Sequence, residues 1–134
     1  MKIRTYQKED YPSLKSIYEK SGWYDAETDD EERIKDQIEK NPNSILVAEE
    51  DGKIVGTVTL LFTGRLGLFF RLISDSAEKN SELLKAGEKI FKDEGYNEVH
   101  ILAPADDTNK QNEYENYGFN SGKNYKWFWK KIIS

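Results

Sequence analysis

Residues 66–95 constrain the fold of this 134-residue chain more than any other stretch. They begin with a near-continuous apolar run, which is typical of a strand that is buried on both faces. Ser74, Asp75 and Ser76 follow, and such side chains can cap a helix. The apolar residues of that helix recur on one face, at Leu83, Leu84, Gly87, Ile90 and Phe91. The stretch therefore predicts a buried strand that leads through a short loop into an amphipathic helix, whose N-terminal N–H groups are a common place for phosphate to bind.

Composition excludes several classes of protein. The formal net charge is −5, from 25 acidic and 20 basic residues, whereas a nucleic-acid partner requires a basic face. No apolar run is long enough to span a membrane, and the start of the chain lacks the apolar region of a signal peptide. The chain has no cysteine and a single histidine, so neither a disulfide framework nor a metal site is expected. We expect one soluble, cytoplasmic domain over residues 1–134, with no nucleic-acid or membrane partner.

The remaining elements alternate between helices and strands. Strands are predicted at residues 3–5, 44–50, 53–62, 99–102 and 125–129, with a further short strand near Phe119. Helices are predicted to start at an Asp10 cap, in the acidic segment 25–32, and near residue 107. Asp51-Gly52 is a strong signal for a hairpin between two of the strands. This order indicates an α/β domain with a mixed sheet.

Three pieces of this pattern resemble one family. They are the Asp51-Gly52 hairpin with the strand at residues 54–58, the strand and helix of residues 66–95, and the run Tyr114-Glu115-Asn116-Tyr117-Gly118-Phe119. In this order they resemble the GNAT superfamily of N-acetyltransferases, over nearly the whole chain. The resemblance implies a three-layer α/β fold, in which about four helices flank a mixed, mostly antiparallel central sheet.

The resemblance also implies a cofactor and a reaction. Members of the family bind acetyl-CoA against the central strand and pass its acetyl group to an amine. The residues that the resemblance implies for acetyl-CoA binding are Phe70, Leu72, Ile73, Ser74, Ser76, Lys79, Asn80, Ser81 and Asn109. Tyr114 matches the tyrosine that protonates the departing CoA thiolate, a role that suits a phenol with an ordinary pKa of about 10.

The loop ahead of the central helix departs from the family pattern. The family wraps the pyrophosphate in a glycine-containing loop that starts with Arg or Gln, but residues 75–81 contain no glycine, arginine or glutamine. Asp75 and Glu78 add negative charge that opposes pyrophosphate binding, whereas a helix N-terminus binds anions without glycine. Two functions remain open: an N-acetyltransferase for an unknown primary amine, and a catalytically degenerate GNAT-fold protein that acts as a binding or regulatory module.

Three features near the N-terminal half and the central strand have two interpretations each. Arg71 interrupts the apolar strand, and it either pairs with a carboxylate of the acidic segment or faces the ligand cleft. Trp23 and Tyr24 either cover the core or line an acceptor pocket. The acidic segment 25–32 either complements a helix dipole or attracts a cationic small-molecule or peptide amine.

Two features of the C-terminal third are also open. His100 lies within a predicted strand, where we expect a structural histidine rather than a catalytic base. No glutamate stands on the central strand as an evident general base. The aromatic run Trp127-Phe128-Trp129 is a candidate interface for a homodimer, which exposure of these side chains would support.

Overall fold

The chain forms two compact units, Met1–Ile101 and a C-terminal unit that begins at Leu102. The structure, a computed structural model, describes residues 1–133. The first unit contains five strands, which are β1 (Lys2–Thr5), β2 (Ile45–Glu50), β3 (Lys53–Phe62), β4 (Gly67–Ser74) and β5 (Val99–Ile101). It also contains a short 3-10 turn, η1 (Lys8–Asp10), and the helices α1 (Tyr11–Lys20), α2 (Glu31–Lys40) and α3 (Ala77–Asp93).

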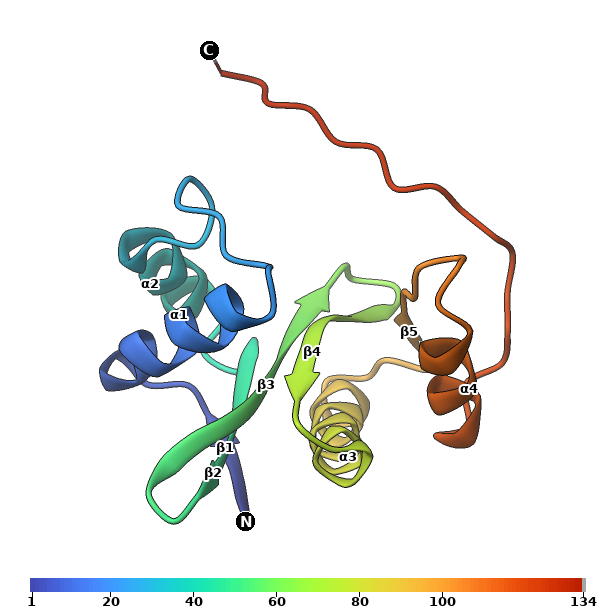
Figure 1. The fold of residues 1–134 in the computed structure, drawn as a ribbon, viewed down its shortest axis with the longest axis horizontal. Coiled ribbons are helices and arrows are strands. Elements are labelled where there is room, and N and C mark those ends of the chain that lie inside the picture. The colour runs from blue at the N-terminus through green and yellow to red at the C-terminus, as the bar shows by residue number, and fades with distance from the viewer. Residues whose placement is uncertain (134) are drawn as a thin grey trace. The chain divides into compact units, whose positions relative to one another are not determined.

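The five strands form one sheet in sequence order, from β1 to β5 (Figure 1). The first four strands are antiparallel to their neighbours, and β5 is parallel to β4. The parallel pair needs a crossover, which α3 supplies, because parallel strands cannot be joined by a hairpin. The predicted α/β fold with a mixed, mostly antiparallel sheet and flanking helices is confirmed.

The helices of the first unit cover both faces of the sheet (Figure 1). On one face, α1 and α2 pack on β2 through a buried cluster of Tyr6, Leu14, Tyr18, Ile34, Ile45 and Val47. On the other face, α3 packs on β3 and β4, where Leu60 and Phe69 are buried. Side chains that alternate along each strand therefore serve both layers, as strand geometry requires.

Helix α3 lies very close to the sheet at two glycines. A β-carbon on Gly87 would stand 2.5 Å from a ring carbon of Phe69, and one on Gly67 would stand 2.6 Å from the ring of Phe91. Glycine is unfavourable inside a helix by about 1 kcal/mol relative to alanine. Its presence at position 87 is explained by this approach, which leaves no room for a side chain.

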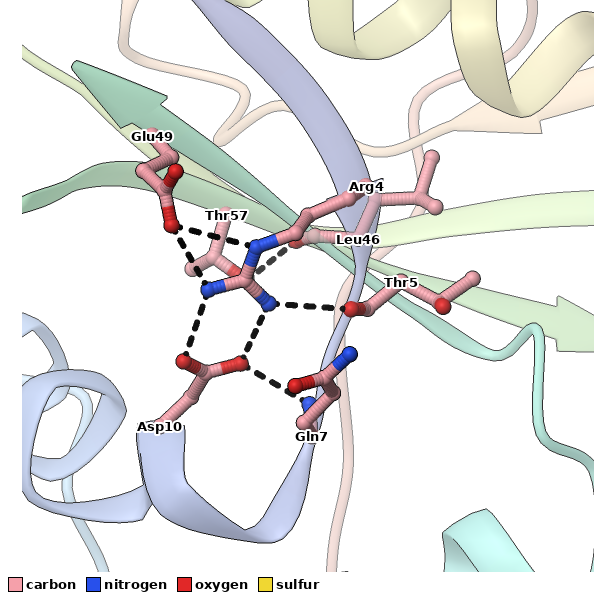
Figure 2. A network of polar contacts seen from close by, with 7 residues as sticks. All are labelled: Arg4, Thr5, Gln7, Asp10, Leu46, Glu49 and Thr57. Carbon is pink, nitrogen blue, oxygen red and sulfur yellow. Dashed lines mark hydrogen bonds and ion pairs between the residues drawn. The ribbon is translucent and has the colours of Figure 1, made fainter. Parts of the chain in front are cut away.

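An ion-pair network joins the first strand to the rest of the sheet (Figure 2). The Arg4 guanidinium donates to both carboxylate oxygens of Asp10, at 2.7 and 2.9 Å, and to Oε1 of Glu49 at 3.0 Å. Asp10 also accepts the Gln7 main-chain N–H at 2.8 Å. Asp10 holds the position before α1, as predicted, but its side chain does not cap that helix because it is bound by Arg4 and Gln7.

The Asp10 carboxylate should make folding stability depend on acid. The hydrogen bond from Arg4 lowers the pKa of Asp10 below its ordinary value of 3.8. A depressed folded-state pKa stabilises the fold above the ordinary pKa, and this stabilisation is lost as the pH falls through the lowered value. We expect Asp10→Asn to reduce the free energy of unfolding by about 2 kcal/mol at pH 7, and by much less in strong acid. Urea unfolding at both pH values measures this effect.

The control for that experiment is Asp36→Asn, which removes the same charge from an exposed position on α2. An exposed substitution of this kind is expected to change stability by less than about 0.5 kcal/mol. If Asp10→Asn and Asp36→Asn have equal effects at pH 7, the network does not stabilise β1.

The C-terminal unit contains one helix, α4 (Thr108–Asn116). The Asp107 side chain caps it by accepting the Lys110 main-chain N–H at 2.9 Å. Gly118, with φ at +99°, follows the helix, and the ring of Phe119 lies 6.1 Å from that of Tyr114. The predicted helix in this region is confirmed.

The predicted C-terminal strand at residues 125–129 is wrong, as is the short strand near Phe119. Between Phe119 and residue 133, the described chain has neither helix nor strand, and Figure 1 shows it as an extended segment beyond α4. Its large apolar side chains are 65–89 % exposed, namely Tyr125, Trp127, Phe128, Trp129, Ile132 and Ile133. Alternating aromatic residues favour a strand, but a strand exists only where a neighbouring strand accepts its hydrogen bonds.

No helix in the described part of the chain is long and apolar enough to cross a membrane.

Candidate functional site

The edge of β4 that faces β5 is paired over only part of its length. Three pairs join the two strands, and the last of them is Phe69 with Ile101. Strand β4 continues to Ser74, and on its other side it still pairs with β3 there. Within residues 1–133, no strand pairs with the β5-facing side of β4 over residues 71–74. Strand β5 ends at Ile101, so this side of β4 presents a stretch of main chain that a ligand with amide groups can contact.

A β-bulge lies on β4 beside this stretch. Thr59 pairs with Phe70 and Thr57 with Ile73, so β4 has one residue more than β3 over this interval. Arg71 has φ at +54°, in the left-handed region. A bulge of this kind bends a strand and redirects its side chains. Here it gives Arg71 a conformation that strand residues with a β-carbon rarely adopt.

The Arg71 side chain enters a largely buried ionic and aromatic cluster. Its Nη1 lies 2.7 Å from Oδ2 of Asp29, and the two side chains are only 12 % and 8 % exposed. The guanidinium also lies over the rings of Tyr18, Phe70 and Trp23, 4.9, 5.3 and 5.7 Å from their centroids. Of the two interpretations of Arg71, pairing with a carboxylate of the acidic segment is confirmed.

The segment that supplies Asp29 is itself fixed to α1. The Tyr11 hydroxyl donates to the Asp29 carbonyl at 2.9 Å, and Asp29 Oδ2 accepts the Asp25 main-chain N–H at 2.9 Å. Burial raises the pKa of Tyr18, although hydrogen bonds with Thr59 and Arg71 oppose that shift. The cluster around Arg71 thus contains side chains from α1, from the segment before α2, and from β3 and β4.

The two aromatic residues before the acidic segment are not equivalent. Tyr24 packs against the buried cluster of α1 and α2. Trp23 is 48 % exposed, and its ring meets that of Phe70 edge-on at 6.5 Å. Trp23 therefore covers part of β4 while it keeps a face towards solvent.

The acidic segment has structural roles that limit its free charge. Asp29 pairs with Arg71. The Asp30 side chain caps α2 by accepting the Arg33 main-chain N–H at 3.0 Å, and Asp25 accepts that of Glu27 at 2.9 Å. Capping and turn formation are the ordinary uses of such residues. These three acids favour the structural interpretation of the segment.

The connection from β4 to α3 consists of only two residues, Asp75 and Ser76. Ser76 caps the helix, because its hydroxyl accepts the Lys79 main-chain N–H at 3.1 Å. The Ser74 hydroxyl donates to Oδ1 of Asn80 at 2.6 Å. The structure therefore brings together Ser74, Ser76, Lys79 and Asn80, four of the residues predicted to bind the cofactor.

Lys79, at the start of α3, is paired with carboxylates. Lys79 Nζ lies 2.7 Å from Asp75 and 3.8 Å from Glu50. The hydrogen bond with Asp75 raises the pKa of Lys79 and lowers that of Asp75. An open pocket of about 510 Å³ beside the helix is lined by Met1, Glu50, Ser76, Glu78, Lys79, Ser81, Glu82 and Lys85. This pocket contains cations and main-chain donors, but also three glutamates.

Tyr114 and Asn109 belong to α4 of the C-terminal unit. The Tyr114 side chain is buried, and burial raises its pKa to about 12 with support from the charges of Glu113 and Asp107. The hydroxyl therefore keeps its proton at neutral pH and can act as a proton donor. Asn109 is exposed in the first turn. The roles of both residues towards a ligand on β4 stay predictions.

His100 is half exposed on β5, and its Nε2 lies 2.8 Å from Oε2 of Glu98. Glu98, two residues away in the sequence, is therefore the acidic partner of this histidine. No group of acidic or histidine side chains among the described residues could hold a metal ion.

The sequence matches the family of GNAT acetyltransferases over residues 2–119. The chain belongs to the GNAT acetyltransferase family. No curated protein matches the chain significantly. The family match covers β1 to α4 and ends at Phe119, so the extended C-terminal segment lies beyond it.

Solved structures support the same fold. Ard1 from Thermoplasma volcanium has a TM-score of 0.75 at 19 % identity, and the match covers 91 % of this chain and 84 % of Ard1. The PaiA N-acetyltransferase from Thermoplasma acidophilum, in complex with coenzyme A, has a TM-score of 0.76 at 19 % identity and 92 % coverage of each chain. Ribosomal-protein-alanine N-acetyltransferase from Brucella melitensis has a TM-score of 0.74 at 19 % identity, with 90 % of this chain and 85 % of that chain covered. At these identities the likeness shows the GNAT fold alone.

The GNAT family uses acetyl-CoA, and the residues present fit the two ends of that molecule unequally. The unpaired side of β4 suits the amide groups of a pantetheine arm, because main-chain N–H and C=O groups are available there. The start of α3 offers helix N–H groups and Lys79 to a pyrophosphate. The adjacent carboxylates of Asp75 and Glu78 oppose the same anion.

Proposed function

We propose that this GNAT protein transfers an acetyl group from acetyl-CoA to a primary amine. The observation that carries the proposal is the β5-facing side of β4, which loses its strand partner after Phe69. Main-chain groups that lack a strand partner can form hydrogen bonds with a ligand instead, which supports binding of the acetyl donor on this strand.

In this reaction, residues of β4 and residues of the helices α3 and α4 would have different roles. The main-chain N–H groups near Leu72 and Ile73 would polarise the thioester carbonyl, since fixed donors stabilise the negative charge that develops on its oxygen. Phe70 and Ser74 would contact the pantetheine arm, and Ser76, Lys79, Asn80 and Ser81 its phosphates. Asn109 would add a contact from α4. Tyr114 would give its hydroxyl proton to the departing thiolate.

Calorimetric titration of the full chain with acetyl-CoA and with CoA tests this proposal. We expect binding in the micromolar range for both ligands, and an acetylated product in a screen of primary amines. If neither ligand binds at millimolar concentration, the acetyltransferase proposal fails. The degenerate GNAT-fold module, which binds or regulates without catalysis, would then be the function to pursue.

Replacing Asp75 with asparagine should tighten the binding of acetyl-CoA. The change removes a negative charge near the expected pyrophosphate and frees the Lys79 ammonium, which now lies 2.7 Å from Asp75. Because the Asp75 side chain is 70 % exposed to solvent, we expect only a modest effect, a dissociation constant about threefold lower. Calorimetry at low salt measures it.

Asp93→Asn is the matched control. Asp93 also pairs with a lysine four residues away on α3, Lys89, at 2.8 Å, but at the opposite end of the helix. Affinity for acetyl-CoA should be unchanged in this variant. Equal gains in both variants would show that net charge, rather than the start of α3, sets the affinity.

The acceptor that we propose is a cationic amine, as a small molecule or on a peptide. Within the acidic segment 25–32, Glu31 and Glu32 are exposed and lie in the first turn of α2. Opposite charge raises the rate at which a cation meets its site, and salt reduces that advantage. The acceptor kcat/KM should therefore fall as the ionic strength rises.

We also propose that the protein forms a homodimer through its C-terminal segment. Residues 123–134 carry four of the 20 Lys and Arg residues and none of the 25 acidic ones, so the segment is basic while the rest of the chain is strongly acidic. Its exposed aromatic residues would likewise become buried against a second copy. A chain that ends at residue 121 should be a monomer by light scattering at concentrations where the full chain is a dimer. A full chain that is monomeric at all concentrations would disprove the dimer.

A further inference from the structure

The left-handed conformation of Arg71 is strained, so favourable interactions elsewhere must offset it. With φ at +54°, a residue with a β-carbon is strained by about 1 kcal/mol or more, whereas glycine adopts this conformation freely. The chain nevertheless has arginine at this point of the bulge. The side-chain contacts of Arg71 must therefore offset the strain of its main chain.

The main contact of Arg71 comes from a different part of the chain. Asp29 binds its guanidinium at 2.7 Å, and both side chains are largely buried. The Nε of Arg71 is buried and has no hydrogen-bond acceptor among the described residues. Removing either partner of a buried ion pair is strongly destabilising, because the other charge is left buried without compensation, so this pair can hold Arg71 in its strained conformation. Its clearest effect is on geometry: it fixes β4 to the segment that precedes α2.

That segment carries an aromatic side chain to the same part of β4. Main-chain N–H groups of Trp23 and Tyr24 both donate to the Tyr18 carbonyl, at 2.8 and 3.2 Å. These bonds place Trp23 directly after α1, with its ring near Phe70 and over the Arg71 guanidinium. Arg71, at the bulge, thus contacts the segment before α2, and the next two residues on β4 are Leu72 and Ile73.

Building on the proposed acetyl transfer, we propose that Asp29 and Arg71 are a positioning pair that couples the acceptor side of the site to the donor side. Asp29 holds Arg71 in its left-handed conformation, and that conformation sets the direction of the Leu72 and Ile73 main-chain N–H groups. The same pair keeps Trp23 against β4 as a wall for the acceptor. Neither residue touches the reacting atoms.

The first test is the affinity of the full chain for acetyl-CoA after Asp29→Asn. Asp29 belongs to the segment before α2 and contacts β4 through Arg71, so a loss of donor affinity would report the coupling. We expect binding about tenfold weaker, because small errors in the position of main-chain donors are costly. Asp36→Asn removes the same charge from an exposed position on α2 and should bind within about twofold of the unchanged protein.

The second test separates the conformation of Arg71 from its charge. Arg71→Gly removes the pair but still permits a positive φ, whereas Arg71→Ala removes the pair and keeps the strain. We expect the glycine variant to bind acetyl-CoA within about threefold of the unchanged protein, and the alanine variant to bind about tenfold more weakly. Equal affinities in the two variants would overturn the link between the bulge and the donor.

The third measurement follows Trp23 without any ligand. Acrylamide quenching of tryptophan fluorescence, with Trp23→Phe as the baseline for Trp127 and Trp129, reports the exposure of the Trp23 ring. Quenching should increase in Asp29→Asn and in both Arg71 variants. Because Asp29→Asn leaves a buried cation and could unfold the chain, Asp29→Asn/Arg71→Gly, which removes both charges, is measured beside it.

These readouts distinguish failure of the inference from failure of the proposed function. If the unchanged protein does not bind acetyl-CoA, the proposed function fails, and the quenching of Trp23 still decides whether the pair holds the segment. If it binds acetyl-CoA and Asp29→Asn binds equally well, the coupling is disproved. Unchanged quenching in the folded double variant would disprove the role of the pair in placing Trp23.

Discussion

Replacing Gly87 with valine is expected to lower the free energy of unfolding by about 3 kcal/mol, since overpacking a well-filled core typically costs up to that amount. The new β-carbon would meet Phe69 at 2.5 Å and Leu60 at 2.9 Å. Both side chains are at most 2 % exposed and cannot move aside without disturbing the sheet. Since domains of this size are stable by only about 5–15 kcal/mol, the loss would be a large fraction of the total.

Chemical denaturation with urea measures this change, and Gly122→Val is the matched control. A β-carbon at Gly122 would meet nothing within 4 Å, so its effect should stay below about 0.5 kcal/mol. If the two valine variants have equal midpoints, α3 does not pack on the sheet as closely as the structure indicates. Functional tests should accompany the measurement, because Phe69 is the last residue of β4 that pairs with β5.

Replacing Tyr114 with phenylalanine is expected to reduce kcat for acetyl transfer by about 100-fold, the lower range for loss of a general acid. Affinity for acetyl-CoA should stay the same, because the change removes only the hydroxyl. Burial raises the pKa of this hydroxyl to about 12. If the protein transfers acetyl groups as proposed, it should therefore lose no activity from ionisation of Tyr114 as the pH rises through 10, where an ordinary tyrosine begins to lose its proton.

Tyr117→Phe is the matched control, at the C-terminal end of the same helix, α4. The Tyr117 hydroxyl donates to Glu113, and its loss should change kcat by less than about threefold. If Tyr114→Phe retains full kcat with the correct fold, Tyr114 is a packing residue, and another group protonates the thiolate. A lower affinity for acetyl-CoA in Tyr114→Phe would indicate a binding role instead.

The central part of the fold could be predicted because its signals are local. The strand Gly67–Ser74 and the helix Ala77–Asp93 follow from an apolar run, a serine that can cap a helix, and apolar residues at helical spacing. Ser76 does cap α3. The Asp51-Gly52 hairpin between β2 and β3 has the same local basis.

The sequence could not show that the C-terminal segment forms no strand. A strand needs a neighbouring strand to pair with, and the sequence pattern describes only one of the two. Residues 125–129 have strand-forming side chains, but the sequence does not state whether another strand is available. Arg71 shows a different limit. Its pairing with an acid was among the alternatives, but a positive φ at an arginine has no sequence signal, because residues with a β-carbon rarely adopt it.

The order of the strands also has a consequence for how the chain folds. Strands β2, β3 and β4 follow one another closely and pair with their sequence neighbours, whereas β1 pairs Lys2 with Glu49 across the whole of α1 and α2. Contacts between distant residues form late, since closing a long loop costs entropy first. The three-stranded meander should therefore form early and β1 should dock last. Because Arg4 acts at this last step, its contacts with Asp10 and Glu49 should slow unfolding and leave the folding rate almost unchanged.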